Sequence, residues 1–415
     1  MKMKKFFIVL FWVFVAISLI CLGFLIANAV NEGVMNDYID GFEAVAYENQ
    51  LTPAFDEEGV PYFTTDGDFK VLHLTDVHIC GGIISAKKDK MALNAVAAMV
   101  TAEKPDLVVV TGDVSFAVPW SGTLNNKYAH GYFTRLMEKL GVYWTVTLGN
   151  HDSESYNFYN RAAVAKMYED PSLTYCLFNK GPEDVYGECN HVINLKNSDG
   201  FVTKSFIMID SNSYTENDPL GLKWDYDNIH EDQIAWYKST VEKYKSYNQA
   251  LLESLDEGEK PADTESLLNP KSLMFMHIPL KEVRDAYNEY VNNNRQNTPE
   301  VSYIRGNDGE TDKVVYSSDY EDDMFETIVE LGSTEALFYG HDHLNNFVLE
   351  YKGVTLSYGY SIDYSAYAGI HKKGYQRGCA VIDCKSDGSL EITHENYYQD
   401  KYPSRYEKET VDMTK

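Results

Sequence analysis

Basic residues are scarce in this chain. Its 415 residues include 36 lysines and arginines but 63 aspartates and glutamates, so the formal net charge at pH 7 is −27. A protein that binds the phosphates of a nucleic acid needs a basic surface, and this balance argues against a nucleic-acid scaffold as a partner. The acidity is typical of a domain that is exposed to solvent.

Several catalytic signatures are missing as well. The chain has no glycine-rich phosphate-binding loop and no Gly-x-Ser-x-Gly turn that would present a serine nucleophile. Any hydrolysis is therefore expected to use activated water rather than a serine of this type. The chain also has no internal repeat, which argues against a repeat architecture.

Cysteine is sparse, with six residues in the chain. One, Cys21, lies in an apolar segment near the N-terminus and is interpreted as a membrane residue. A location outside the cell permits disulfides, and a Cys176–Cys189 bridge would close a loop. The five cysteines beyond the apolar segment are an odd number, so at least one thiol stays free or pairs elsewhere. They are Cys80, Cys176, Cys189, Cys379 and Cys384.

An uncharged apolar run occupies residues 6–27, directly after Lys2, Lys4 and Lys5. About 20 apolar residues suffice to cross a bilayer as a helix. The lysines should stay on the cytoplasmic side, which places the rest of the chain outside. Ala27-Asn28-Ala29 resembles a cleavage site, so a secreted protein with a removed signal peptide is the alternative. The length of the run favours a retained single-pass anchor in the cell membrane.

The remaining length is enough for one large α/β domain, and 44% hydrophobic residues allow a sizeable core. We expect an anchor or signal segment over residues 1–29, a connector over 30–67 and a catalytic domain over 68–398. Surface insertions are expected near 252–271 and 284–322, and the polar stretch 281–323 is expected to be a lid or a mobile loop. A frayed, charged tail is expected over 399–415.

Polar side chains follow each of five apolar runs that read as buried strands. The clearest case is residues 142–148, which lead directly into Gly149, Asn150, His151 and Asp152. α/β proteins bind their ligands at the carboxyl ends of strands, so these side chains are expected to meet. The side chains that follow the five runs are two carboxylates, one amide and five imidazoles. They are Asp76, His78, Asp113, Asn150, His151, His277, His341 and His343.

Mixed oxygen and imidazole ligands suit manganese, iron or zinc better than calcium or magnesium. The set exceeds what one ion needs, whereas two ions that share a bridging carboxylate would use all of it. Two ions about 3.5–4 Å apart lower the pKa of a shared water and neutralise charge on a phosphate group. The expected reaction is in-line hydrolysis of a phosphoester. His73 is interpreted as a packing residue, and the other histidines are expected to be structural. These are His130, His191, His230, His371 and His394.

The ordered pattern Asp-x-His, Gly-Asp, Gly-Asn-His-Asp, His and Gly-His-x-His resembles the calcineurin-like metallophosphoesterases, a superfamily that includes the purple acid phosphatases. The resemblance covers residues 70–384. It implies a four-layer α/β/β/α sandwich, in which helices flank two mixed β-sheets, here preceded by one transmembrane helix. It also implies a first ion on Asp76, His78, Asp113 and His343, and a second on Asn150, His277 and His341, with Asp113 as the bridge.

The resemblance further implies a catalytic role for two residues of the Gly-Asn-His-Asp motif. His151 would touch the substrate phosphate and act as general acid, and Asp152 would steady it. One position departs from the purple acid phosphatases, which carry a metal-bound tyrosine three residues after the Gly-Asp aspartate. That position is Phe116 here. Phenylalanine provides no phenolate, so the protein is expected to be colourless and to belong to a nearby branch that lacks this tyrosine.

Together these features predict a metal-dependent phosphomonoesterase that faces the outside of the membrane and acts on a phosphorylated substrate. A phosphodiesterase or nucleotidase with the same two ions is the alternative, because the metal ligands do not separate these activities. A receptor-like domain that kept the fold without catalysis is the non-enzymatic alternative.

Overall fold

The computed structural model describes residues 2–261, 263–311, 313–367, 369–373 and 377–411. The helices are α1 (Lys2–Asp40), α2 (Ala86–Glu103), α3 (Lys127–Leu140), α4 (Arg161–Tyr168), α5 (Glu231–Ser254), α6 (Thr264–Leu268), α7 (Lys281–Asn292) and α8 (Met324–Leu331). Short 3₁₀ turns are η1 (Pro119–Ser121), η2 (His151–Ser153) and η3 (Ile370–Lys373). The strands are β1 (Ala54–Phe55), β2 (Pro61–Thr64), β3 (Phe69–Leu74), β4 (Leu107–Thr111), β5 (Trp144–Thr147), β6 (His191–Lys196), β7 (Val202–Met208), β8 (Lys271–Phe275), β9 (Val301–Arg305), β10 (Thr334–Tyr339), β11 (Val348–Tyr351), β12 (Val354–Tyr358), β13 (Gly378–Cys384) and β14 (Leu390–Asn396).

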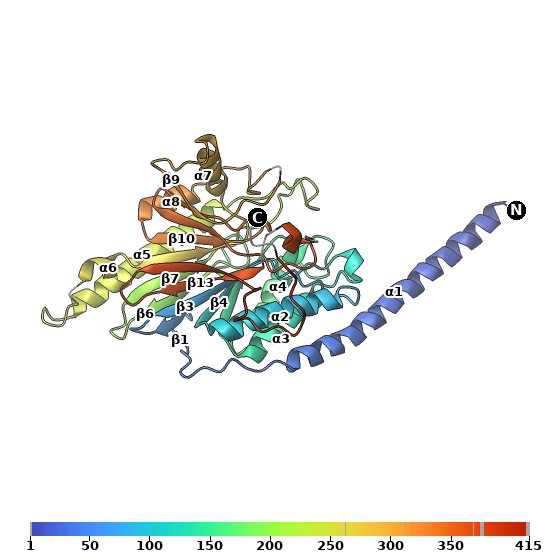
Figure 1. Ribbon diagram of the computed structural model, residues 1–415, viewed down its shortest axis with the longest axis horizontal. Helices are drawn as coiled ribbons and strands as arrows, with labels where there is room; N and C mark the ends of the chain where they lie inside the picture. The colour runs from blue at the N-terminus through green and yellow to red at the C-terminus, as the bar shows by residue number, and fades with distance from the viewer. Residues whose placement is uncertain (1, 262, 312, 368, 374–376, 412–415) are drawn as a thin grey trace.

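Two mixed sheets form the centre of the molecule (Figure 1). The smaller has the order β14-β13-β3-β4-β5, and the larger has the order β1-β2-β6-β7-β8-β10-β12-β11-β9. An apolar layer joins them, to which β3 and β4 of the smaller sheet and β7 and β10 of the larger contribute. Helices α1 to α4 cover the outer face of the smaller sheet, and α5, α7 and α8 cover that of the larger. The four-layer α/β/β/α sandwich is thus confirmed.

Strand β4 shows why these segments form central strands. Leu107 and Val109 point into the layer between the sheets, whereas Val108 and Val110 pack under the helices. A strand that is buried on both faces needs apolar side chains in both directions, which explains its unbroken apolar run. β3, β4 and β5 are parallel to one another, and so are β7, β8, β10 and β12. Their carboxyl ends therefore lie along one edge of the sandwich.

Two segments that were expected to be loose have regular structure. The region 281–323 was predicted to be a lid or a mobile loop, yet it contains α7 and the edge strand β9. The apolar face of α7, including Val283 and Ala286, packs into the outer core of the larger sheet, which explains the difference. In the predicted insertion 252–271, α5 continues to Ser254 and α6 follows, held by a bond from the Asn248 side chain to the Leu267 carbonyl (2.7 Å).

The two ends of the domain are also more ordered than expected. The predicted connector over 30–67 contains β1 and β2, and β2 joins the larger sheet beside β6. The tail beyond residue 398 packs back on the domain as far as it is described. Tyr402 is buried there, and the Arg405 backbone donates to the Asn94 side chain (2.9 Å). A frayed tail is therefore not observed over residues 399–411.

All six cysteines, each within the described residues, are free thiols. The bridge considered between Cys176 and Cys189 is therefore not formed. Cys189 is buried, and its sulfur accepts a hydrogen bond from the Leu148 backbone (3.3 Å). It thus helps to hold the strand end from which the Gly-Asn-His-Asp motif begins.

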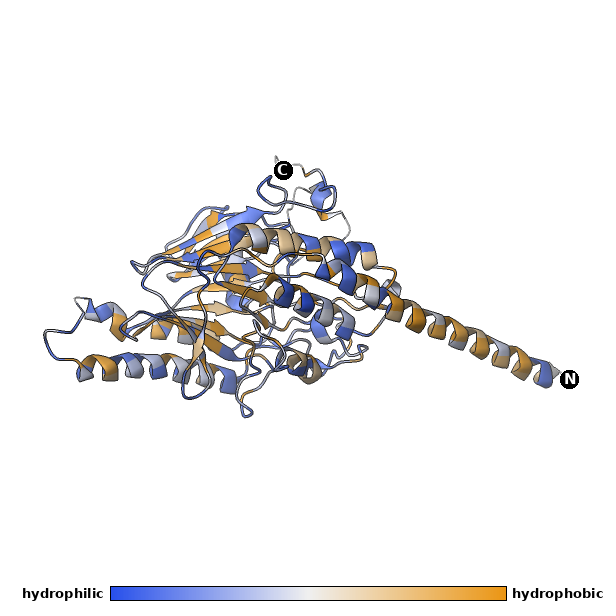
Figure 2. Ribbon diagram, turned by 90° about the horizontal axis from the view of Figure 1, so that it is seen from below, coloured by the Kyte–Doolittle hydropathy of each residue, from blue (hydrophilic) through white to orange (hydrophobic). Residues whose placement is uncertain are grey.

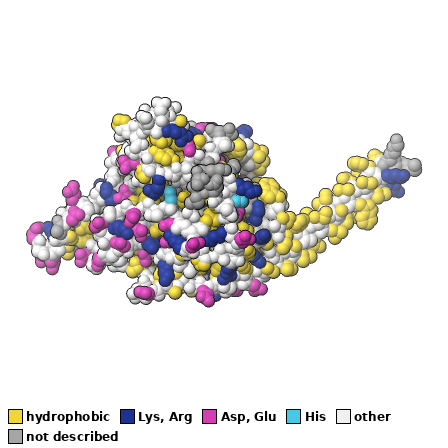
Figure 3. All heavy atoms as spheres, viewed as in Figure 1, with side chains coloured by type: hydrophobic (Ala, Val, Ile, Leu, Met, Phe, Trp, Pro, Cys, Tyr) yellow, Lys and Arg dark blue, Asp and Glu magenta, His cyan; other side chains and the backbone are white. Residues whose placement is uncertain are grey.

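Helix α1 has two dissimilar halves. Its first half is apolar and exposed, and it projects from the domain in Figures 2 and 3. Its second half is packed on the domain, where Asn28, Asn31, Met35 and Ile39 are buried. The span from Met3 to Asp40 is a single helix that is long and apolar enough to cross a membrane. No break in the helix separates the exposed half from the docked half.

Candidate metal centre

All eight side chains that were predicted from the sequence lie at the carboxyl edge of the sandwich. Asp76 and His78 follow β3, Asp113 follows β4, and the remaining residues follow β5, β8 and β10. β3, β4 and β5 belong to the smaller sheet, whereas β8 and β10 belong to the larger. The two stacked sheets therefore bring together loops that are more than 200 residues apart in the sequence.

Two groups of side chains are close enough to hold a metal ion. The first group is Asp76, His78, Asp113 and His343, whose ligand atoms lie within 4.8 Å of one another. The second group, Asp113, His277 and His341, meets the same limit. Asp113 belongs to both, and its Oδ2 lies 3.4 Å from His78 Nε2 and 3.1 Å from His277 Nε2. One carboxylate thus connects two adjoining ligand sets.

The amide of Asn150 completes the second group. Its Oδ1 lies 3.2 Å from His277 Nε2, while its Nδ2 donates to the Tyr214 hydroxyl (2.8 Å). The latter contact orients the amide so that the oxygen faces the histidine. The seven residues expected to be metal ligands are therefore all brought together.

The unsatisfied atoms of the cluster match what a cation would supply. Both ring nitrogens of His78 and Oδ2 of Asp113 are buried, and within the described residues they have no hydrogen-bond partner. Buried polar atoms are costly when they are left unpaired. Burial lowers the pKa of His277, but the Asp113 and Asp76 carboxylates outweigh it and raise the pKa to about 9. The two carboxylates thus attract positive charge into this site, and the donor set fits metal ions.

Backbone strain is concentrated at the same residues. Asp76, His78 and Asp113 each have a φ of 51°, and His341 has a φ of 75°. Residues other than glycine rarely adopt this left-handed region, and each such case costs about 1–3 kcal/mol. Four residues with a strained backbone lie in one cluster. This indicates that the fold tolerates a loss of stability in order to orient these side chains toward one another.

Two glycines in the motifs are required by close approach. A Cβ atom at Gly149 would lie 2.1 Å from Asp113 Oδ1, and one at Gly340 would lie 1.8 Å from Thr75 Oγ1. Any side chain at either position would displace the loops that carry Asp113 and Asp76. Gly149 therefore lets two neighbouring loops of the smaller sheet, those after β4 and β5, approach each other, and Gly340 lets the larger sheet approach the smaller one at the site.

Residues 69–345 match the family model described as calcineurin-like phosphoesterase, which is more than half of the chain. The chain belongs to the calcineurin-like phosphoesterase family. The resemblance seen in the sequence is thus confirmed, and the paired ligand groups lie where the matched residues converge.

Several known proteins are similar to this chain. Probable inactive purple acid phosphatases 28 and 29 of Arabidopsis thaliana are 26% and 28% identical to it, over 78% and 77% of this chain and 77% of each relative. Phosphatase DCR2 of Saccharomyces cerevisiae is 25% identical, over 69% of this chain and 46% of that protein. The crystal structure of a dimetal phosphatase from Danio rerio aligns with a TM-score of 0.45 and 11% identity, over 80% of this chain and 97% of that one.

The partner expected for His151 was wrong. The Asp152 carboxylate accepts three backbone N–H groups, from Asp113 (2.9 Å), Ser115 (2.9 Å) and Gly149 (2.8 Å). The Asp152 carboxylate thus ties the loops after β4 and β5 together. The carboxylate that meets His151 is that of Glu154, whose Oε1 lies 2.7 Å from His151 Nδ1. The only sequence signal for this contact is that Glu154 is an acidic residue three positions after His151. Asp152, directly after His151, offers the same signal, so the sequence does not distinguish the two.

Other contributors to the site carry no clear signal in the sequence. Asp363 Oδ2 lies 3.5 Å from His343 Nδ1, and Asp363 is itself held by backbone N–H groups of the loop that follows it. The Thr111 carbonyl contacts His277 Nδ1 (2.8 Å). Partners of this kind fix the orientation of a metal-ligating imidazole. His73, in contrast, is buried against Phe275 and Phe338, which confirms its role in packing.

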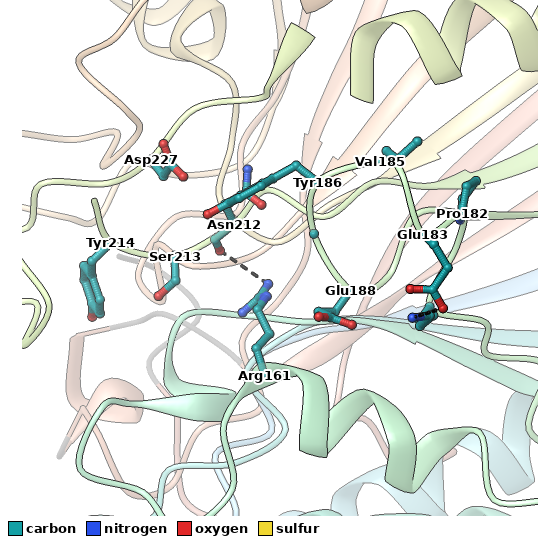
Figure 4. Close-up of a pocket in the computed structure, with 12 residues that line it drawn as sticks. Arg161, Pro182, Glu183, Val185, Tyr186, Glu188, Asn212, Ser213, Tyr214 and Asp227 are labelled. Atoms are coloured by element: carbon teal, nitrogen blue, oxygen red, sulfur yellow. Dashed lines mark hydrogen bonds and ion pairs between the residues drawn. The ribbon is translucent and has the colours of Figure 1, made fainter. Parts of the chain in front are cut away.

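A largely buried ion pair supports the loop that carries Asn150 and His151. The Arg161 guanidinium donates to the carbonyls of Gly149 and Leu148 (both 2.8 Å) and pairs with Asp210. Figure 4 shows the Arg161 side chain pointing toward Asn212 in a neighbouring pocket of about 370 Å³. Asp210 follows β7 at the same sheet edge, and the sequence shows it there without indicating this role.

Asp210→Asn is expected to lower the free energy of unfolding by about 3 kcal/mol at neutral pH, because it leaves the Arg161 charge buried without its partner. Burial raises the pKa of Asp210, but the Arg161 guanidinium and backbone donors outweigh it, so this pKa lies below its usual range. The stabilisation is therefore complete above about pH 4 and lost as the pH falls through the lowered pKa.

Urea denaturation of wild type and Asp210→Asn, at neutral pH and at acid pH, measures this difference. Asp40→Asn is the matched control, since Asp40 also pairs with an arginine, Arg135, but both side chains are exposed. Solvent screens such pairs, so the control should lose far less stability. Equal losses in the two variants would contradict a special role for the buried pair.

Phe116 occupies the position at which the purple acid phosphatases carry a metal-bound tyrosine. Its ring centroid lies 4.9 Å from that of His78 and 5.0 Å from that of His151. It thus packs directly on the ligand cluster without offering an oxygen. A colourless protein stays a prediction, which absorption of the iron-loaded protein would test.

A pocket of about 540 Å³ lies above the cluster. Asp113, His151, His341 and His343 form part of its floor, and aromatic and aliphatic side chains form much of its wall. Tyr316, from the segment after β9, contributes to this wall, and its backbone N–H donates to the Asp342 carboxylate (3.2 Å). The ligand cluster is therefore accessible to a substrate from one side.

Proposed function

We propose that this chain is a metal-dependent phosphomonoesterase with a dinuclear centre. The observation that carries the proposal is the position of Asp113, whose buried carboxylate is shared by two adjoining ligand groups. Asp76, His78, Asp113 and His343 would hold one ion, and Asp113, Asn150, His277 and His341 would hold the other. Manganese, iron and zinc all suit this donor set.

When bound, such a pair of ions activates a water for attack on phosphorus and neutralises the charge of the phosphate oxygens. The chain itself supplies the proton for the leaving group. The Glu154 carboxylate contacts Nδ1 of His151 (2.7 Å) and leaves Nε2 as the nitrogen that can face the substrate. A proton passed from Nε2 to the leaving oxygen completes the cleavage as general acid catalysis.

The names of the relatives point in two directions. The yeast relative is named a phosphatase, and the Arabidopsis relatives are named probable inactive purple acid phosphatases. This chain has all seven ligand residues in place, together with His151 at the pocket. A complete and converged set supports catalysis rather than a fold that has lost it.

We further propose that α1 is a retained anchor and that the catalytic domain faces the outside. Residues 6–27 span about 33 Å at 1.5 Å per residue, which is close to the thickness of a bilayer core. The lysines at the N-terminus favour the cytoplasmic side for that end. Helix α1 runs unbroken through residues 27–29, and Asn28 and Asn31 are buried on the domain. Cleavage after Ala29 would remove Asn28 and with it the hydrogen bonds of this side chain to Gly122 and Ile83 of the domain.

Full-length protein in detergent should release phosphate from p-nitrophenyl phosphate once manganese, iron or zinc is supplied. Elemental analysis of the same sample should give about two ions per chain, as expected of a dinuclear site. A comparison with bis(p-nitrophenyl) phosphate separates a monoesterase from a diesterase. The proposal fails if the metal-loaded protein leaves phosphomonoesters intact, and a preference for the diester would replace it with the diesterase alternative.

A further inference from the structure

Exposed apolar side chains gather at the mouth of the catalytic pocket. Outside α1, the described residues include seven large apolar side chains that are more than half exposed. One is Phe55, on the edge strand β1. The other six are here called the mouth patch: Ile84, Trp120, Phe158, Leu220, Leu222 and Trp224. Apolar side chains gathered on a surface mark a site that contacts another protein or a membrane.

Two sides of the pocket contribute to the mouth patch. Trp120 lines one wall, and Leu220, Leu222 and Trp224 line another. Ile84 and Phe158 lie outside the pocket but are tied to the loop that carries Trp120. The Ile84 backbone donates to the Ser121 carbonyl (3.1 Å), and the Phe158 backbone donates to the Leu124 carbonyl (3.1 Å). The apolar surface is thus a rim around the entrance to the metal cluster.

The mouth patch adjoins the apolar helix α1. The Asn28 side chain donates to the Gly122 carbonyl (2.8 Å) and accepts from the Ile83 backbone (2.8 Å). One turn earlier, Phe24 lies beside the same loop, since a Cβ atom on Gly122 would be 3.4 Å from both Phe24 and Ile84 side-chain carbons. In Figure 1 the free half of α1 leaves the domain beside these loops.

The position of Asn28 also indicates where a bilayer would end. The apolar residues of α1 are exposed on all sides as far as Ile26, and from Asn28 onward one face of the helix is covered by the domain, where Asn28, Asn31, Met35 and Ile39 are buried while Val30 and Val34 stay exposed. The membrane surface must therefore lie near the loops that Asn28 binds. Trp120 is two residues from Gly122, and tryptophan prefers this interfacial depth. Lys87 and Lys88, exposed just after Ile84, suit the headgroup region.

The pocket wall favours one kind of leaving group. None of the described residues that line it is lysine or arginine. A substrate with several anionic groups would find no basic partner on this wall, whereas an apolar body would find tryptophan, leucine and tyrosine. The wall therefore suits a single phosphate carried on an apolar group.

We propose that the mouth patch rests on the outer surface of the bilayer that α1 crosses, and that the substrate is a phosphate monoester of a membrane lipid. This inference rests on the phosphomonoesterase activity proposed above. Water oxygen bonds to phosphorus as the bond from phosphorus to the lipid oxygen breaks. His151 passes its proton to that oxygen, so inorganic phosphate enters the water and the lipid alcohol stays in the membrane.

The test uses full-length protein in phosphatidylcholine vesicles that contain dioleoyl phosphatidic acid. Glycerol 3-phosphate is the matched soluble substrate, because it has the same phosphate and glycerol without the acyl chains. Wild type should turn over the lipid with a kcat/KM about 100-fold higher, as burial of acyl chains adds to binding. Ile84→Glu/Phe158→Glu should lower lipid turnover about tenfold and leave glycerol 3-phosphate unchanged, since charge at this depth opposes membrane contact.

Phe55→Glu is the control for the double variant, because Phe55 is equally exposed but lies on a remote edge strand. It should leave both rates unchanged. Equal rates of wild type on the lipid and on glycerol 3-phosphate would overturn the inference while leaving phosphatase activity intact. Unchanged lipid turnover in the double variant would also overturn it.

A second measurement does not depend on catalysis. The background variant is Trp12→Phe, which removes the tryptophan of the α1 segment. In this background, brominated phosphatidylcholine should quench part of the tryptophan fluorescence. The added double substitution Trp120→Phe/Trp224→Phe should remove the part of the fluorescence that the bromolipid quenches. Trp144 is buried and Trp236 lies on α5, away from the mouth. Failure of all hydrolysis with quenching present would reject the phosphatase but keep the membrane contact. Hydrolysis of soluble esters without quenching would reject the membrane contact alone.

Discussion

Asp113→Asn is expected to abolish metal binding at both positions and to lower phosphomonoester hydrolysis by at least about 10³-fold, equivalent to roughly 4 kcal/mol of barrier. Asp113 is the one residue that belongs to both ligand groups. An amide has the same size but no negative charge to hold two cations together. The loss should therefore exceed that of any variant confined to one group, such as His343→Ala or His341→Ala.

The measurement combines elemental analysis with p-nitrophenyl phosphate turnover. Asp106→Asn is the matched control, since Asp106 lies just before β4 and Asp113 lies just after it. The Asp106 carboxylate accepts the Lys70 backbone N–H (2.8 Å), far from the ligand cluster along the strand. Its variant should keep full metal content and activity. An Asp113→Asn protein that still binds two ions would rule out the shared carboxylate as the bridge.

His151→Ala is expected to slow hydrolysis by about 10²–10³-fold while metal content stays unchanged, because His151 is assigned to proton transfer rather than to metal binding. The loss should depend on the leaving group. p-Nitrophenolate leaves readily without a proton, so its ester should suffer least. Phenyl phosphate, with a more basic leaving oxygen, should suffer several-fold more.

Glu154 and Asp152 give a matched pair of variants for this assignment. Glu154→Gln removes the negative charge that contacts His151 Nδ1 and should reproduce the leaving-group dependence with a smaller loss, about tenfold. Asp152→Asn disturbs three backbone bonds of the loop and should lower stability instead. A uniform loss for both esters in His151→Ala would show that His151 binds substrate without donating the proton.

Much of the site could be predicted because each ligand is placed by local sequence. Asp113 follows an unbroken apolar run. Such a run is fully buried only in a strand that is covered on both faces, as β4 is. Parallel strands present their carboxyl ends at one edge, so residues that follow them converge without further information. This reasoning also holds for Asn150 and His277, whose side chains meet at 3.2 Å.

The same reasoning failed where contacts depend on the path of a loop. Asp152 and Glu154 both lie near His151 in sequence, but the turn at η2 directs Asp152 to the backbone of the β4 loop and Glu154 to the imidazole. The segments 281–323 and 399–411 were expected to be loose because they are polar. Their few apolar residues, among them Val283 and Tyr402, nevertheless anchor them to the core.

Sequence alone determined the α/β class, the order of the strands that carry ligands, and the eight polar side chains that follow them. These features follow from periodicity and from residues adjacent to strands, and both are local properties of a chain. The four-layer arrangement and the division into seven ligands and a catalytic His151 came from the resemblance to the family. Tertiary structure placed Asp113, the bridge that the resemblance implies, in both ligand groups. It alone decided that Glu154 meets His151 and that α1 leaves the domain beside the pocket mouth. Each of these depends on how separate segments pack across two sheets, and no short stretch of sequence contains that information.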